Sequence, residues 1–281
     1  MIRVTALCSV LLAMALAVPA AAQEAEESNF SGIFQTDVTN AYFFRGILQE
    51  REGVIIQPWI ELYYSLYSSE DGFLRDVTVG GGTWLSFQSE RTLASQDPQW
   101  LYEADFYPLV SLGFAGGVTL TTIYYFYTSP NDAFSTVQEL NFKLAWDDSE
   151  VFGKFAVHPW VNLAIETDRT SFGPNEGEGL QLGIAPTLFA TESGSFTLSA
   201  PAEIGLSLDD YYENGGGGEN LFGYGSAGLL ASIPLSFVPE GAGAWSLGLS
   251  GKYLFFSSTL EAANGSRSTY PVGMASLSVG F

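Results

Sequence analysis

The sequence predicts an all-β protein, a closed antiparallel up-and-down transmembrane β-barrel of about 12 strands. Three observations support this fold class. Apolar and polar residues alternate over long runs, short and long connections alternate between the runs, and the chain closes with an alternating run that ends at Phe281. Strict alternation indicates strands with one apolar and one polar face, and alternating loop lengths are typical of outer-membrane barrels.

The alternation is clear in residues 54–67, where Ile60, Leu62 and Tyr64 share one face and Glu61 lies on the other. We identify twelve such runs: 30–48, 54–67, 73–88, 100–113, 117–128, 134–146, 150–167, 179–190, 195–208, 220–236, 244–258 and 269–281. Strands of soluble proteins usually have about 5–6 residues. A tilted strand needs about 9–11 residues to cross a bilayer, so these runs are long enough to span one.

The connections also alternate in length. Five are predicted as tight turns: "SSEDG", "AGG", "DDSE", "ESGS" and "VPEGAG". The connections between them are mostly longer and more polar, such as "SERTLASQDPQ" and "DDYYENGGGGEN". An even number of strands places both termini at the end with the short turns.

The last run places Leu277, Val279 and Phe281 on one face, and we interpret these residues as the signal recognised by the barrel-insertion machinery. Prolines are the main objection to the barrel, because each removes a hydrogen-bond donor from a sheet that has no free edge. Bulges, kinks or strand starts are expected at the prolines that fall inside predicted strands, namely Pro58, Pro108, Pro159, Pro186, Pro201 and Pro234.

The N-terminus predicts export. Residues 1–22 combine Arg3, a short apolar run and an A-x-A site at Ala20–Ala22, as a secretory signal peptide does. A membrane anchor is the alternative, but the apolar run is shorter than the roughly 20 residues of a spanning helix. We therefore divide the chain into a signal peptide (1–22), a short acidic segment (23–29) and a barrel domain (30–281). Cys8, the only cysteine, leaves with the signal peptide, so no disulfide is expected.

The charge balance narrows the choice of partners. The formal net charge is −21, with only 10 Lys and Arg residues. Such acidity argues against nucleic acids and anionic lipid headgroups as partners. A hydrophobic content of 47% argues against disorder. A secreted β-sandwich or a periplasmic lipid carrier remains the alternative fold, since a sandwich also alternates.

Short motifs in the first half resemble a known family. Tyr42, Arg45 and Gly46 form a Y-x-x-R-G element, and Gln57 begins a Q-P strand. Together with "GGGTWLS" (80–86), "LYEADFYPLVSLGF" (101–114) and "YYFYTSP" (124–130), they resemble the Gcw_chp family of outer-membrane proteins over about 35–145. The resemblance implies a barrel in the outer membrane. It implies no activity, because the family has no established one.

Charged residues on the polar faces are expected to point into the barrel lumen. On this interpretation Arg45 faces the lumen while Tyr42, Phe44 and Leu48 face lipid. Glu61 is its first candidate partner, because a buried lone charge is costly. Glu103, Asp105 and Glu139 are further candidates. The complete predicted network comprises Arg45, Glu61, Glu103, Asp105, Glu139, Lys143, Lys154, His158, Glu166, Glu203 and Lys252.

These charges allow two functional interpretations. The first is a porin-like channel for passive diffusion of small hydrophilic solutes, with cations or weakly polar solutes favoured by the negative charge. A sugar or nucleoside is also compatible with an aromatic and polar lumen, formed by Trp59, Tyr63, Trp84, Tyr107, Tyr125 and Trp160. The second is a closed structural or adhesive barrel with a charge-networked lumen. Its acidic outer loops would bridge divalent ions to lipopolysaccharide.

Enzymatic activity is the minor alternative. The only histidine, His158, would have to act with Ser199, Ser207 or Glu166 in an outer-membrane lipase or protease. No G-x-S-x-G motif is present, and we expect no catalysis, no cofactor and no metal site. Acidic loop clusters such as Asp209–Asp210 are expected to be solvated rather than to bind Ca²⁺, because they lack EF-hand spacing. The oligomeric state stays open.

Overall fold

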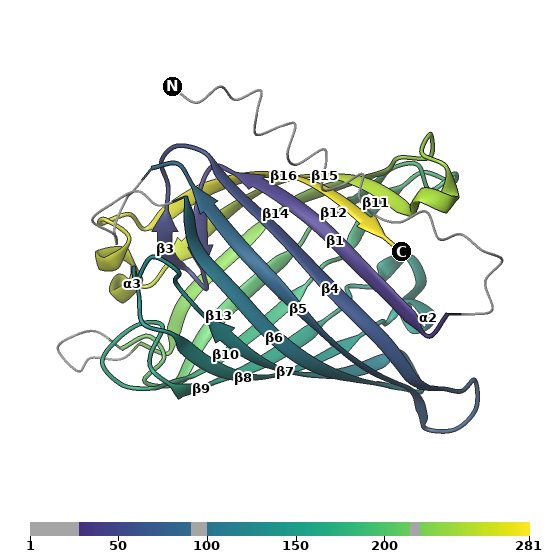
Figure 1. The fold of residues 1–281 in the computed structure, drawn as a ribbon, viewed down its shortest axis with the longest axis horizontal. Helices are drawn as coiled ribbons and strands as arrows, with labels where there is room; N and C mark the ends of the chain where they lie inside the picture. The colour runs from purple at the N-terminus through teal and green to yellow at the C-terminus, as the bar shows by residue number, and fades with distance from the viewer. Residues whose placement is uncertain (1–27, 91–99, 214–219) are drawn as a thin grey trace.

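The computed structural model describes residues 28–90, 100–213 and 220–281. It confirms the predicted fold class: a closed antiparallel β-barrel with twelve spanning strands in the described part of the chain (Figure 1). The predicted signal peptide and most of the acidic segment lie outside the described residues. So do parts of two of the long polar loops.

Ten spanning strands are continuous: β1 (Phe30–Thr39), β4 (Ile55–Ser68), β5 (Leu74–Gln88), β6 (Leu101–Phe114), β7 (Val118–Tyr127), β8 (Val137–Trp146), β9 (Trp160–Asp168), β14 (Phe222–Pro234), β15 (Ala244–Phe256) and β16 (Thr269–Gly280). The other two are each formed by two short strands. These are β10 (Glu178–Ile184) with β11 (Thr187–Ala190), and β12 (Thr197–Ser199) with β13 (Ala202–Asp209).

The barrel closes between its first and last strands. In β1, Phe34 pairs with Val279 of β16 on one side and with Ile60 of β4 on the other. All neighbouring strands are antiparallel. Phe281 continues the closure beyond β16, because its backbone N–H donates to the carbonyl of Gly32 over 3.0 Å. The termini of the wall therefore meet at one end.

The two faces of the wall follow the predicted alternation. Along β4, Leu62, Tyr64 and Leu66 are exposed on the outside, whereas Glu61 and Tyr63 line a cavity inside. An exposed apolar outer surface is stable only against an apolar environment, as in a lipid bilayer. Among the described residues, no helix is long and apolar enough to cross a membrane.

The first predicted strand is wrong in its second half. We expected one strand over 30–48, but β1 ends at Thr39 and the chain then forms a separate hairpin. This hairpin consists of β2 (Tyr42–Phe44) and β3 (Ile47–Glu50). Its turn residues, Arg45 and Gly46, have φ angles of 45° and 82°. Two positive φ angles in succession are those of a type I′ turn, whose twist matches a tight hairpin.

The seventh predicted strand also begins later than expected. We expected 150–167, but β9 starts at Trp160. The preceding residues form the helix α2 (Ser149–Phe152) and the 3-10 helix η1 (Gly153–Phe155). The expected tight turn "DDSE" is thus the start of a longer connection over residues 147–159.

The prolines are accommodated largely as expected. Pro159 precedes β9, Pro234 ends β14, and Pro186 and Pro201 lie in the breaks between β10 and β11 and between β12 and β13. Pro58 and Pro108 lie inside continuous strands. Each faces a local gap in one ladder: β4 and β5 are unpaired around Pro58, and β6 and β7 around Pro108. The missing donors therefore fall where the ladder is interrupted.

The two ends of the barrel differ. The turn end carries the start of β1, the end of β16 and the connection with α2. The loop end carries the β2–β3 hairpin, helix α3 (Ser258–Ala263) and the longer loops (Figure 1). The hairpin, α3, the loop after β13 and the start of β14 pack into one buried cluster that includes Ile47, Tyr211, Tyr212, Tyr224 and Leu260. The lumen at the loop end is therefore filled by a packed core.

Candidate functional site

The hairpin tip is tied to the opposite wall by an ion pair. Arg45 contacts both carboxylate oxygens of Glu139 on β8, with a distance of 2.6 Å from Nη2 to Oε1. The same guanidinium donates to Asn141 over 3.1 Å and to the hydroxyl of Tyr211. Glu139 has no exposed side-chain surface. A bidentate pair with further hydrogen bonds is the arrangement in which a buried charge pair is tolerated.

This geometry corrects the predicted environment of Arg45. Its partner is Glu139, one of the further candidates, and the first candidate Glu61 is engaged elsewhere. The aromatic neighbours do not face lipid either. Tyr42 and Leu48 are buried inside the barrel, and Phe44 packs against the ring of Tyr127 with centroids 5.0 Å apart. Because the chain leaves the wall at Thr39, both faces of the hairpin point into the lumen.

The hairpin backbone is held by two loops. The amide of Asn264, which follows α3, donates to the carbonyl of Gly46 over 2.8 Å and accepts from the N–H of Leu48 over 2.9 Å. Tyr212, in the loop between β13 and β14, donates to the carbonyl of Arg45 over 3.1 Å. A turn inside a lumen needs such partners, because unpaired buried backbone groups are costly.

The sides of the hairpin bind β6. The hydroxyl of Tyr42 donates to Glu103 over 2.9 Å, and the hydroxyl of Tyr102 donates to Gln49 over 2.8 Å. The hairpin is thus fixed at its tip to β8, along its backbone to the loops and along its sides to β6.

Two cavities lie on either side of the hairpin tip. A cavity of about 650 Å³ contains Arg45, Lys143 and several tyrosines of β4 to β7. A second cavity of about 250 Å³ lies among the hairpin, β6 and the loop before β8. Phe44 and Tyr127 line both cavities. The contact between these two rings, next to the Arg45–Glu139 pair, therefore separates the two spaces.

The remaining lumenal charges have identifiable surroundings. Glu61 lines the larger cavity and accepts from the hydroxyls of Tyr107, over 2.8 Å, and Tyr63. Asp105 lines the same cavity and accepts from the N–H of Thr128. Lys143 lies over the ring of Trp160, 5.2 Å from its centroid.

Glu203 and Lys252 belong to a different part of the lumen. Both line a third cavity of about 360 Å³, on the side of β13 to β16. Glu203 also accepts from the hydroxyl of Tyr224 over 3.2 Å. Both residues thus line a cavity that Glu61 and Asp105 do not line.

Three residues that we predicted to line the lumen either lie outside it or hold a loop in place. Lys154 is exposed in η1, near the ring of Phe155. His158 belongs to the connection before β9, because the predicted strand starts too early. Glu166 is buried in β9 but accepts from the backbone N–H groups of Ser171 and Gly177, so it anchors a loop. Lys154 and His158 are thus wrong as members of the lumenal network.

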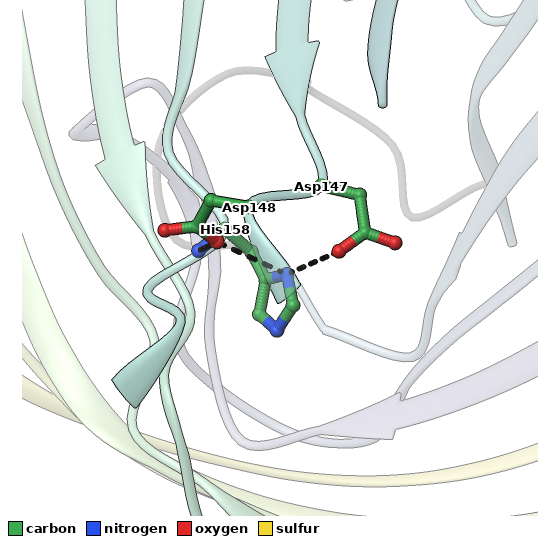
Figure 2. A group of neighbouring side chains, drawn as sticks. All are labelled: Asp147, Asp148 and His158. Carbon is green, nitrogen blue, oxygen red and sulfur yellow. Dashed lines mark hydrogen bonds and ion pairs between the residues drawn. The ribbon is translucent and has the colours of Figure 1, made fainter. Parts of the chain in front are cut away.

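His158 lies in a compact group with two aspartates at the turn end (Figure 2). Its Nδ1 is 3.5 Å from Asp147 and 3.7 Å from Asp148. One imidazole and two carboxylates could in principle ligate a divalent cation. The carboxylate of Asp148 already accepts the backbone N–H groups of Val157 and His158, so the group closes the turn.

The electrostatics of this turn follow from those contacts. Burial alone would raise the pKa of Asp148, but the hydrogen bonds from Val157 and His158 outweigh it and lower the pKa. Hydrogen bonds from Ser149 lower the pKa of Asp147, and the nearby His158 adds to this effect. Two of the three residues considered as partners of His158 lie elsewhere: Glu166 anchors a loop at the other end, and Ser207 is bonded to Tyr212.

Several residues of the site escaped prediction from the sequence. Tyr211, Tyr212 and Asn264 lie in polar loops, where nothing in the alternation marks them as buried. The one available signal was the Arg45–Gly46 pair, since glycine at the second turn position favours a type I′ hairpin. Without Asn or Asp before the glycine that signal is weak.

Comparisons with known proteins find similar architectures only. No family model and no curated protein matches the chain. Among solved structures it is similar to a NanC porin, with 10% identity over 88% of this chain and 98% of that chain and a TM-score of 0.44. It is also similar to the Salmonella typhi outer membrane phospholipase dimer with bound calcium, with 13% identity over 89% of this chain and 90% of that chain and a TM-score of 0.44.

Pseudomonas aeruginosa OccK10 is also similar, with 9% identity over 91% of this chain and 99% of that chain and a TM-score of 0.39. At such identities and TM-scores, these likenesses concern the barrel architecture and carry no argument about function. The resemblance of the first half to the Gcw_chp family stays a prediction.

Proposed function

We propose that the protein is an outer-membrane channel for passive diffusion of small hydrophilic solutes, in which the β2–β3 hairpin forms the constriction. The observation that carries the proposal is that Phe44 of the hairpin and Tyr127 of β7 line both cavities, of about 650 and 250 Å³, and contact each other there. Solute would pass when the hairpin tip moves away from Tyr127 and Glu139.

The contacts of the hairpin support a movable constriction. It is joined to the wall through its two ends, and its tip is held by side-chain hydrogen bonds rather than by a β-ladder to the barrel. Because these contacts are separate from the ladders of the wall, the hairpin can move without opening the wall. The formal net charge of −21 favours cations and neutral solutes over anions.

Single-channel recording in planar bilayers tests the proposal. The wild-type protein is expected to show a low conductance with brief larger openings. Phe44→Ala with Tyr127→Ala removes the ring contact and should raise the mean conductance several-fold, whereas Phe142→Ala, on the exposed face of β8, should leave it unchanged. Currents at the lipid baseline for the wild type and the opened variant alike would reject the channel.

A closed structural or adhesive barrel is the second candidate. The buried cluster that fills the lumen at the loop end favours it, because a packed core stabilises a wall and blocks passage. Recording from the opened variant separates the two candidates. A structural barrel stays silent even without the ring contact, whereas a channel conducts.

The remaining expectations belong to the same proposal. Outer-membrane lipids surround the exposed apolar face, and the insertion machinery recognises the last strand through Leu277, Val279 and Phe281. Leu277 and Phe281 are exposed, as such a signal requires, while Val279 is covered at the turn end. We infer no catalytic role and no nucleic-acid partner.

A further inference from the structure

We propose that the larger lumenal cavity binds a neutral saccharide, so that the channel is selective for sugars. This inference rests on the proposed function, in that the bound sugar is the solute that passes. The cavity of about 650 Å³ has the size of a small-ligand site. Its chemistry differs from one arc of the wall to the next.

The first arc is aromatic. Tyr63, Trp84, Tyr107 and Tyr125 come from four successive strands, β4 to β7, and all line the cavity. The glycines of β5 make this arrangement possible. A Cβ on Gly82 would lie 2.6 Å from the ring of Tyr107, so only glycine lets that ring lie over β5. Aromatic rings offer the apolar C–H face of a sugar a large contact area.

The second arc is polar and continues strand by strand. Ser111 of β6 faces Thr121 of β7, their hydroxyls 3.2 Å apart, and Thr121 pairs with Lys143 of β8. Lys143 pairs with Asn162 of β9, which in turn pairs with Gln181 of β10 and donates to it over 3.1 Å. Hydroxyl and amide groups both donate and accept hydrogen bonds, as sugar hydroxyls require.

The charges favour a neutral ligand. Arg45 is neutralised by Glu139, which leaves Glu61, Lys143 and the carboxyl group of Asp105 on the cavity wall. An anionic solute would meet the carboxylate of Glu61, while a sugar hydroxyl can form hydrogen bonds with either carboxyl group.

The ring geometry favours a sugar over a nucleobase. Tyr107 and Tyr125 are inclined to each other by 46°, and Tyr125 stacks directly on Tyr127 at 9° with centroids 5.1 Å apart. Neither pair leaves a slot for a flat base between parallel rings. Inclined rings instead offer separate apolar patches, which fit a puckered pyranose.

Tryptophan fluorescence of the folded, detergent-solubilised protein tests this inference, because Trp84 and Trp160 line the cavity. Glucose and maltose are titrated as neutral probes, with gluconate and uridine as anionic and nucleoside controls. We expect a saturable change with a neutral sugar and at least tenfold weaker binding of gluconate and uridine. No saturable change with either sugar, or tighter binding of a control, would overturn the inference.

Two variants locate the binding. Tyr107→Ala should weaken sugar binding about tenfold, while Phe106→Ala, which removes a neighbouring ring on the outer face, should bind as the wild type does. Heat-dependent gel mobility verifies that both variants are folded. Equal binding by all three proteins would place the sugar elsewhere and overturn the inference.

Recording separates this inference from the proposed function. If the protein binds sugar but never conducts, the saccharide site is supported and the channel is rejected. If the protein conducts but neutral sugars neither bind to it nor reduce its current, the channel is supported and the saccharide site is rejected.

Discussion

Arg45 occupies a position that only a folded-in hairpin explains. It follows three aromatic or apolar neighbours in sequence, yet its guanidinium ends in a buried ion pair with Glu139 on the far side of the lumen. Removing one partner of such a pair leaves an uncompensated charge, whereas replacing both by apolar groups is often harmless.

Glu139→Ala is therefore expected to destabilise the barrel by about 3–5 kcal/mol, because it leaves Arg45 without its carboxylate. Denaturant unfolding in detergent micelles measures this change. The double variant Arg45→Met with Glu139→Leu should recover most of the loss. Glu192→Ala, at an exposed turn, serves as the control and should have no effect. A single variant as stable as the control would contradict the buried pair.

Gly46 tests the hairpin turn. Its φ is +82°, and an added Cβ would lie 2.7 Å from the side chain of Tyr224. Gly72 has a similar φ of +90°, but an added Cβ there meets nothing within 4 Å. Both alanine variants carry the same kind of backbone strain, of order 1–3 kcal/mol. Gly46→Ala should lose more stability in denaturant unfolding than Gly72→Ala; equal losses would show that the turn does not pack against Tyr224.

At the scale of elements, the hairpin shows that alternation predicts extended chain but does not predict whether that chain belongs to the wall or folds into the lumen. The wall strands follow a period of two because one face meets an apolar surrounding and the other the lumen. A hairpin inside the lumen has the same period, so residues 42–48 read as a continuation of β1. Residues 150–159 are predicted as part of the next strand for a similar reason, since Lys154 and His158 fall on one face of an extended chain and Phe155 and Val157 on the other, although α2 and η1 occupy this stretch.

Asn264 is expected to control the hairpin as an element. Asn264→Ala removes both hydrogen bonds to the hairpin backbone and leaves two buried groups unpaired, at a cost of about 1–3 kcal/mol each. The mean open time in single-channel recordings should lengthen. Asn40→Ala is the matched control, because Asn40 also bonds to two backbone groups, but on β16. Equal open times in the two variants would contradict the role of Asn264.

The connection over residues 147–159 should be sensitive to acid. A carboxylate whose pKa is lowered on folding contributes stability above its ordinary pKa of about 3.9. That stability is lost as the pH falls through the lower, folded value. For Asp148 we therefore expect pepsin to cleave this connection only in strong acid. Asp148→Ala should be cleaved at every pH at which pepsin acts; identical cleavage profiles would refute the contact.

At the scale of the whole molecule, a wall with a twelve-strand pattern encloses a lumen with two different halves. The loop end is packed around the hairpin, whereas the turn-end side of Phe44 and Arg45 keeps an open cavity. The sequence was sufficient for the wall, because its two faces meet different surroundings. It was insufficient to predict the partner of Arg45, because the pairing with Glu139 depends on where the chain leaves the wall.

A reversible cross-link tests most directly whether the hairpin tip forms the constriction of the channel. Cys8, in the predicted signal peptide, is the only native cysteine, so Phe44→Cys with Tyr127→Cys introduces a unique thiol pair. A short, reducible bis-thiol reagent then joins the hairpin to β7 while single-channel current is recorded. The unlinked pair lacks the ring contact and should conduct as the opened alanine variant does; linking should abolish the larger openings, and reduction should restore them. Openings that persist unchanged across a link verified on a gel would contradict the account.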